Sequence, residues 1–115
     1  MDKILEITLL YDFYGELLTE KQKSVIEMYH LDDYSLQEVA NEFNITRQAV
    51  HDMIKRTEKI LFEYESRLGL VNKFLVQKQR LSLAIEMLDK AINDNKLNDK
   101  IEFEEIKKVL SDIVD

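Results

Sequence analysis

The sequence predicts an all-α protein. Proline is absent from the 115 residues and glycine occurs only twice, so long segments contain no residue that breaks a helix. Hydrophobic residues make up 45% of the chain, enough to build a folded core rather than a disordered tail. Apolar residues recur at steps of three and four, the spacing that gathers them on one face of a helix. We therefore expect an N-terminal helix, a helix-turn-helix and a C-terminal helical hairpin.

The N-terminal segment MDKILEITLLYDFYGELL predicts a helix over residues 2–14. Its apolar residues cover more than one stripe, so we expect this helix to be buried on most sides or to meet a partner. Gly15 is expected to end it. Four acids interrupt the segment, which fits neither a signal peptide nor a membrane span, and a cytoplasmic protein is expected.

Two capping signatures mark the helices that follow. Thr19 and Gln22 form T-x-x-Q, in which each side chain satisfies a backbone donor at a helix start. The helix after it is expected to bury Val25, Ile26, Met28 and Tyr29, and to stop near Asp32–Asp33. Ser35 and Glu38 form a second box, whose short helix has Leu36, Val39, Ala40 and Phe43 on one face.

The segment TRQAVHDMIKRTEKIL, residues 46–61, predicts the second helix of a helix-turn-helix, capped by Thr46. Asn44 tolerates the left-handed conformation that a tight turn requires. Ala40 is small enough for a close approach of the two helices, and Ile45 and Val50 fill their shared core. Further inward residues are expected at Met53 or Ile54 and from Thr57 to Leu61.

The C-terminal third predicts a helical hairpin over residues 71–114. Two narrow stripes follow steps of four and three and flank the polar break NDNKLNDK. They consist of Phe74, Lys78, Leu81, Ile85, Leu88 and Ile92, then Phe103, Ile106, Leu110 and Ile113. We expect residues 1–69 to form one domain and residues 70–115 a hairpin that packs on it, on a second copy, or on both. The large apolar surface predicts a homodimer.

Charge is distributed unevenly. The net charge of −7 argues against indiscriminate binding to phosphate backbones. Residues 1–45 hold ten acids and three bases, whereas residues 46–62 hold Arg47, Lys55, Arg56 and Lys59 against Asp52 and Glu58. Residues 66–85 carry Arg67, Lys73, Lys78 and Arg80 and no acid. These four bases suit either a surface that contacts successive phosphates or the edge of a dimer interface, and we favour the dimer interface.

Residues 18–61 resemble region four of sigma factors. That family's pattern has a Leu-Thr start, an apolar helix, an acidic hinge, and the motifs S-L-x-E-[VI]-A and T/S-R-x-x-V. The matching elements are Leu18–Thr19, Val25–Ile26–Tyr29, Asp32–Asp33, Ser35–Leu36–Glu38–Val39–Ala40 and Thr46–Arg47–Val50. The whole chain is similar to the YlxM-like family of small bacterial helix-turn-helix proteins, whose genes lie beside those for the signal recognition particle GTPase. This resemblance implies a regulator or accessory of that targeting pathway and brings no catalytic residues.

The candidate nucleic-acid contacts lie on the solvent face of residues 46–61. They are Thr46, Arg47, Gln48, His51, Lys55, Arg56 and Lys59. Arg47 is the best candidate for guanine, because its guanidinium matches two adjacent acceptors. Region four commonly carries arginine-like and glutamine-like residues where this chain has His51 and Asp52, and a carboxylate there repels phosphate. The alternative is an ordinary solvated helix surface, on which Asp52 with Arg56 and Lys55 with Lys59 are simple neighbours.

Other chemistry is not expected. Cysteine is absent, and His30 and His51 lack a third ligand, so we expect neither a disulfide nor a metal site. Asp32–Asp33 and Glu104–Glu105 suit a hinge and a solvated face, neither glycine belongs to a phosphate-binding loop, and no cofactor or enzymatic activity is expected. Two functions stay open: sequence-selective DNA binding, or a non-DNA adaptor for the protein or RNA of the signal recognition particle.

Overall fold

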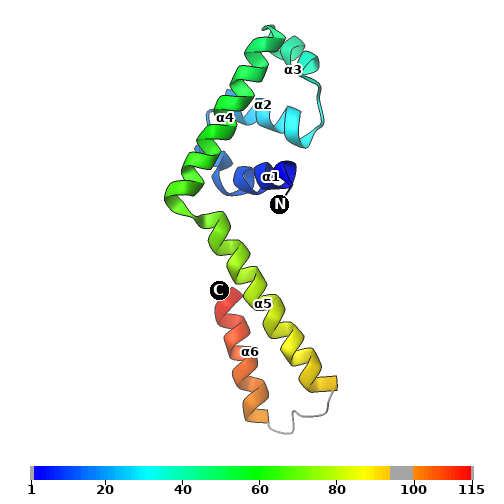
Figure 1. Ribbon diagram of the computed structural model, residues 1–115, viewed down its shortest axis with the longest axis vertical. Coiled ribbons are helices and arrows are strands. Elements are labelled where there is room, and N and C mark those ends of the chain that lie inside the picture. Colours follow the sequence, from blue (N-terminus) through cyan, green and yellow to red (C-terminus); the bar gives the residue numbers. More distant parts are fainter. Residues whose placement is uncertain (1, 94–99, 115) are drawn as a thin grey trace. The chain divides into compact units, whose positions relative to one another are not determined.

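The computed structural model describes residues 2–93 and 100–114, which are built from helices and contain no β-strand (Figure 1). The all-α prediction is confirmed. The chain forms two compact units, Met1–Val71 and Asn72–Asp115. The elements are α1 Lys3–Tyr14, the 3-10 turn η1 Gly15–Leu17, α2 Glu20–Ile26, the π-helical turn η2 Glu27–Leu31, α3 Leu36–Phe43, α4 Arg47–Leu68, α5 Leu70–Asn93 and α6 Lys100–Val114. None of the described helices is long and apolar enough to cross a membrane.

The predicted helix starts of the first unit are confirmed. Thr19 accepts a hydrogen bond from the Gln22 amide while the Gln22 side chain accepts one from the Thr19 amide. Ser35 and Glu38 make the same reciprocal pair at the start of α3. Because each box satisfies two backbone donors that the helix itself cannot, it fixes where the helix begins.

Gly15 ends α1 as expected, but not through a left-handed conformation. It follows the last residue of α1, but its φ of −55° is right-handed, and the chain continues into η1 instead of turning away. A Cβ atom on Gly15 would lie 3.0 Å from the Tyr11 ring. Glycine therefore gives the aromatic ring room here, and no left-handed turn is involved.

The first helix buries a single face, contrary to the expectation that most of its sides are covered within the chain. Ile7, Leu10 and Tyr14 are buried. Ile4 and Leu5 are 59% and 52% exposed. The apolar residues of α1 outnumber the positions that α4 and η2 can cover, so the alternative of a partner stays open.

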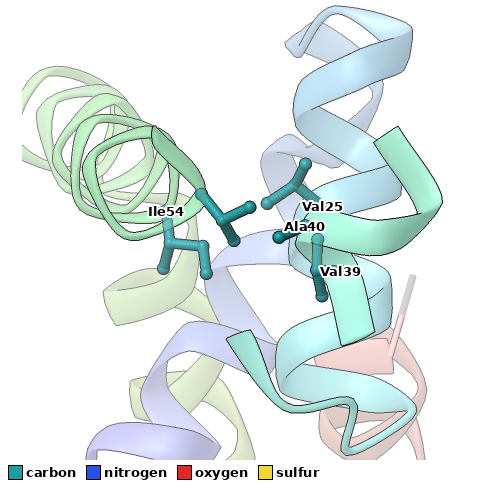
Figure 2. Packing of buried hydrophobic residues seen from close by; sticks show 5 residues of the cluster. Val25, Val39, Ala40 and Ile54 are labelled. Carbon is teal, nitrogen blue, oxygen red and sulfur yellow. The ribbon is translucent and has the colours of Figure 1, made fainter. Parts of the chain in front are cut away.

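A small apolar core joins α2, α3 and α4 (Figure 2). Val25, Val39, Ala40, Val50 and Ile54 are buried there. Ile45, Met53 and Phe43 pack against this cluster while partly exposed. The core places α3 firmly on the N-terminal half of α4, as the spacing of apolar residues predicted.

The far end of α4 is held by polar side chains. Gly69 adopts a left-handed conformation, with φ of 63°, and ends the helix. The Tyr14 hydroxyl donates to Glu65 Oε1 at 2.5 Å and accepts from the Leu70 amide at 3.0 Å. The same Glu65 oxygen accepts from the Val71 amide at 3.0 Å. Two side chains from α1 and α4 thus satisfy the first amides of α5.

The second unit is a helical hairpin, because α6 returns beside α5 (Figure 1). Of the stripe expected on α5, Leu81 and Leu88 are half-buried within the chain, whereas Phe74 and Ile85 are exposed. The other half-buried positions include Ala84 and Ala91. Apolar residues occur on more than one stripe of α5, so their spacing alone did not select the covered one. The side chains of Ile92 and Phe103, and residues 94–99 of the polar break, lie outside the described residues.

Candidate nucleic-acid interface

The turn between α3 and α4 sets the direction of the candidate recognition helix. Asn44 ends α3 in the left-handed conformation, with φ of 53° and ψ of 45°, as predicted. The Ile45 amide then donates to the Ala40 carbonyl at 3.1 Å. The Thr46 hydroxyl accepts from the Ala49 amide at 3.0 Å, so α4 starts at Arg47. These local bonds fix the helix-turn-helix without any long-range contact.

All seven candidate contacts are exposed to solvent, but several are already engaged. They are Thr46, Arg47, Gln48, His51, Lys55, Arg56 and Lys59. The Gln48 side chain donates to Asp52 Oδ1 at 3.0 Å, and His51 Nδ1 lies 3.6 Å from that same oxygen. Arg47, Arg56 and Lys59 form no ion pair with any residue that the structure describes. Among the described residues, Arg47, Arg56 and Lys59 are therefore available to a ligand. Gln48 and His51 are instead engaged by Asp52.

Six of the seven residues, all but Thr46, fall into two neighbouring patches along α4. Arg47, Gln48 and His51 border a shallow hollow of about 490 Å³ together with Leu36 of α3. Further along, a second hollow of about 450 Å³ is lined by Asp52, Lys55, Arg56 and Lys59. The first patch thus adjoins both helices of the motif, and the second belongs to α4 alone. Each patch offers cations to an anionic ligand.

One ionic cluster beside these patches was not predicted from the sequence. Glu58 is buried, which agrees with the inward range Thr57 to Leu61, but its ionic partners were not predicted. Its carboxylate lies 3.5 Å from Lys3 Nζ, 3.9 Å from Lys55 Nζ and 3.9 Å from His30 Nε2. The helical spacing held a signal, because position 58 follows Ile54 by four residues and precedes Leu61 by three.

The arrangement suits binding of a polyanion through charge and hydrogen bonding. In the described ranges 2–93 and 100–114, no group of three or more His, Cys, Asp or Glu side chains is placed to hold a metal ion. Arginine forms bidentate hydrogen bonds to phosphate, and lysine acts on it as a point charge.

Comparison with known proteins gives the family. The profile of the UPF0122 family, described as "Putative helix-turn-helix protein, YlxM / p13 like", matches residues 1–108. The chain belongs to this family. The predicted resemblance is confirmed, and the match extends through α5 into α6, well beyond the helix-turn-helix.

Individual relatives agree with this assignment. The UPF0122 protein of Geobacillus is 47% identical over 109 residues, which cover 93% of this chain and 99% of the relative. The UPF0122 protein of Halalkalibacterium halodurans is 47% identical over 97 residues, covering 84% and 89%. The UPF0122 protein of Listeria innocua is 46% identical over 103 residues, covering 88% and 93%. Each relative thus matches over most of both chains.

Proposed function

We propose that this UPF0122 member is a regulatory protein that binds DNA through the exposed face of α4. The proposal rests on three cations of the second helix of a helix-turn-helix. They are Arg47, Arg56 and Lys59, and none forms an ion pair with a residue that the structure describes. A second helix of this kind enters the major groove with its early residues near the bases. Arg47 is the first residue of α4 and stands in that position.

The acidic residues nearby explain why binding is expected to depend on sequence. Asp52 holds Gln48 and lies beside His51, so contact with DNA has to replace these interactions. A net charge of −7 also weakens attraction to any phosphate backbone. Affinity for random DNA is therefore expected to be low, and a preferred site has to supply base contacts.

The direct test is a fluorescence-anisotropy titration of labelled duplex DNA with wild type, Arg47→Ala and Arg67→Ala. Arg67 is the matched control, because it is an exposed arginine at the opposite end of the same helix. We expect Arg47→Ala to lose about tenfold in affinity, since a bidentate base contact contributes roughly 1–3 kcal/mol. Equal losses in both variants would reject Arg47 as a specific contact.

A second candidate is an adaptor that binds the protein or RNA of the signal recognition particle. The exposed apolar side chains of Ile4 and Leu5 on α1 favour it, because DNA binding does not use them. The acidic net charge and Asp52 also suit a protein partner better than a phosphate backbone. Labelled particle RNA in the same titration, and a pull-down with the purified particle protein, separate the two candidates.

We also propose that the second unit forms a homodimer. Val76, Leu83 and Met87 are exposed and follow steps of seven and four, which places them on one stripe of α5. The helix carries bases in its first half, at Lys73, Lys78 and Arg80, and acids later, at Glu86 and Asp89. Two antiparallel copies of α5 would bring opposite charges together.

The oligomeric state is tested by light scattering coupled to gel filtration. Wild type is expected at twice the 13.7 kDa of one chain. Leu83→Lys is expected at the mass of one chain, because it puts a charge into the apolar stripe. Ser82→Lys is the matched control and keeps the dimer, since Ser82 lies on another face. A wild type that elutes as a single chain would reject the dimer.

A further inference from the structure

A hollow of about 650 Å³ lies within the first unit, bordered by α1, η2, the hinge after η2, α3 and α4. The charged groups that face His30 across it are Lys3 of α1 and Lys55 and Glu58 of α4. Asp33 of the hinge, Glu38 of α3 and Arg47 of α4 line the same hollow. The hydroxyls of Tyr29 and Tyr34 are its remaining titratable groups. Two of the seven candidate contacts, Arg47 and Lys55, therefore share a cavity with buried ionisable side chains.

Two of these side chains are almost fully buried. Only 8% of the Glu58 side chain and 10% of the His30 side chain are exposed. His30 Nε2 has no hydrogen-bond partner among the residues that the structure describes, and its 3.9 Å separation from Glu58 Oε1 is too long for a hydrogen bond. A buried polar atom without a partner is costly, so its retention here calls for an explanation.

The lysines of the cluster, in contrast, reach solvent. The side chains of Lys3 and Lys55 are 60% and 55% exposed, and both point their ammonium groups toward Glu58. Glu58 is thus paired with two cations that, without it, are available to a ligand in the hollow. Lys3 comes from α1, so the cluster also extends the cationic surface beyond the helix-turn-helix.

Protonation of His30 changes which cations pair with Glu58. An imidazolium can donate to Glu58 after a shift of about 1 Å, which gives a short charge-assisted hydrogen bond. The imidazolium then replaces the two lysines as the partner of the Glu58 carboxylate, and the hollow gains one positive charge. Burial lowers the pKa of His30 below its ordinary value, although Glu58 acts in the opposite direction. The imidazole is therefore neutral at neutral pH and takes up a proton only as the pH falls.

We infer that Lys3, His30, Lys55 and Glu58 form a proton-linked binding site for a phosphate group of the bound nucleic acid. Lys3 and Lys55 hold the phosphate, Glu58 competes for them, and protonated His30 removes that competition. The inference rests on the proposed function and names its regulation: binding is tighter in acid. It also adds a contact, Lys3, that lies 44 residues before Arg47, the first residue of the recognition helix.

The test measures sulfate binding to the full chain by NMR at pH 6 and pH 8, at constant ionic strength. Sulfate imitates a phosphate diester and keeps its charge over this range. Wild type is expected to bind sulfate about fivefold more tightly at pH 6, the upper end of what one exposed charge pair contributes. By reciprocal linkage, sulfate is expected to raise the pKa of His30, because the bound anion favours the imidazolium. Equal affinity at the two pH values would overturn the inference.

Variants assign the effect to the cluster. His30→Gln is expected to remove the pH preference, and Lys3→Gln to weaken binding at pH 6. Lys3 is exposed, so its replacement does not endanger folding. Glu58→Gln is expected to bind sulfate more tightly than wild type at pH 8, because the competitor has gone. The matched control is His51→Gln, which removes the chain's other histidine and keeps the preference. A preference that survives in His30→Gln would contradict the inference.

A parallel titration with labelled duplex DNA separates this inference from the proposed function. Wild type first establishes whether the duplex is bound at all. In the His51→Gln variant, which keeps His30 as the only histidine, DNA affinity is then expected to rise about fivefold between pH 8 and pH 6. DNA binding without that rise would overturn the proton-linked site alone. Sulfate binding with the expected pH preference, but no DNA binding at either pH, would support the site and reject the proposed function.

Discussion

Both units are built from helices that carry apolar residues at helical spacing, yet among the described residues only the first unit has fully buried side chains. Side chains such as Ile7, Val25 and Leu61 have no exposed surface. From Asn72 onward, none of the side chains that the structure describes is buried. In the hairpin, Ala84, Met87, Ile106 and Val109 instead line an apolar hollow of about 420 Å³. Helical periodicity therefore predicts helices in both units but self-sufficient packing in only one.

The helix ends show the same difference. In the first unit, Asp2, Thr19, Ser35 and Thr46 each cap a helix through a side chain. The first amides of α5 depend instead on Tyr14 and Glu65, which belong to the first unit. These two amides, of Leu70 and Val71, still belong to the first unit.

The largest expected effect comes from truncating matched leucines in the two units. Leu61→Ala is expected to lower the free energy of unfolding by about 2–5 kcal/mol, because it leaves a cavity among buried residues. Leu83→Ala is expected to change it by less than about 0.5 kcal/mol at low protein concentration, since this side chain is 57% exposed. Urea unfolding measures both. Comparable losses would show that the hairpin has an intrachain core.

A smaller effect tests the polar contacts at the end of α4. Tyr14→Phe is expected to cost about 1–3 kcal/mol, because it removes the hydrogen bond to Glu65 and leaves the Leu70 amide without its acceptor in a partly buried place. The matched variant is Tyr11→Phe, whose hydroxyl donates to the exposed Glu27 and whose loss is expected to cost about 1 kcal/mol or less. Thermal unfolding compares them, and a larger loss for Tyr11→Phe would be evidence against the role given to Tyr14.

The smallest expected changes in the free energy of unfolding come from two serine substitutions, and they have opposite signs in the two units. Ser35→Ala is expected to destabilise by about 1 kcal/mol, because the capping box of α3 is lost. Ser82→Ala is expected to stabilise α5 by a few tenths of a kcal/mol, since alanine is the better helix former at an exposed interior position. Helix content and unfolding midpoints from circular dichroism measure both. Destabilisation by Ser82→Ala would indicate a contact in the hairpin.

Features that depend on neighbouring residues were predictable from the sequence. The boxes at Thr19 and Ser35, the turn at Asn44 and the cap at Thr46 each need partners only three to five residues away. The π-helical turn η2 was not predicted, because no residue type in Glu27–Leu31 demands it. The contact of Tyr14 with Glu65 was also missed, since 51 residues separate its partners.

The candidate site was predictable in its residues but not in their partners. Exposure of Arg47, Arg56 and Lys59 follows from the helical spacing around Val50 and Ile54. That Glu58 is buried beside His30 and Lys3 depends on how α1 and η2 meet α4. Such contacts are set by tertiary packing, which a single sequence does not reveal.

The salt dependence of DNA affinity tests the central claim most directly, that the exposed face of α4 binds nucleic acid. Anisotropy titrations of wild type with labelled duplex are repeated over a series of salt concentrations. Three cations expected on phosphates, Lys55, Arg56 and Lys59, predict a slope of log affinity against log salt of about −3. Lys59→Ala is expected to reduce its magnitude by about one, whereas Arg47→Ala, which removes a base contact, is expected to lower the affinity at every salt concentration. A wild type that binds no duplex at low salt, or a slope near zero, would contradict the claim.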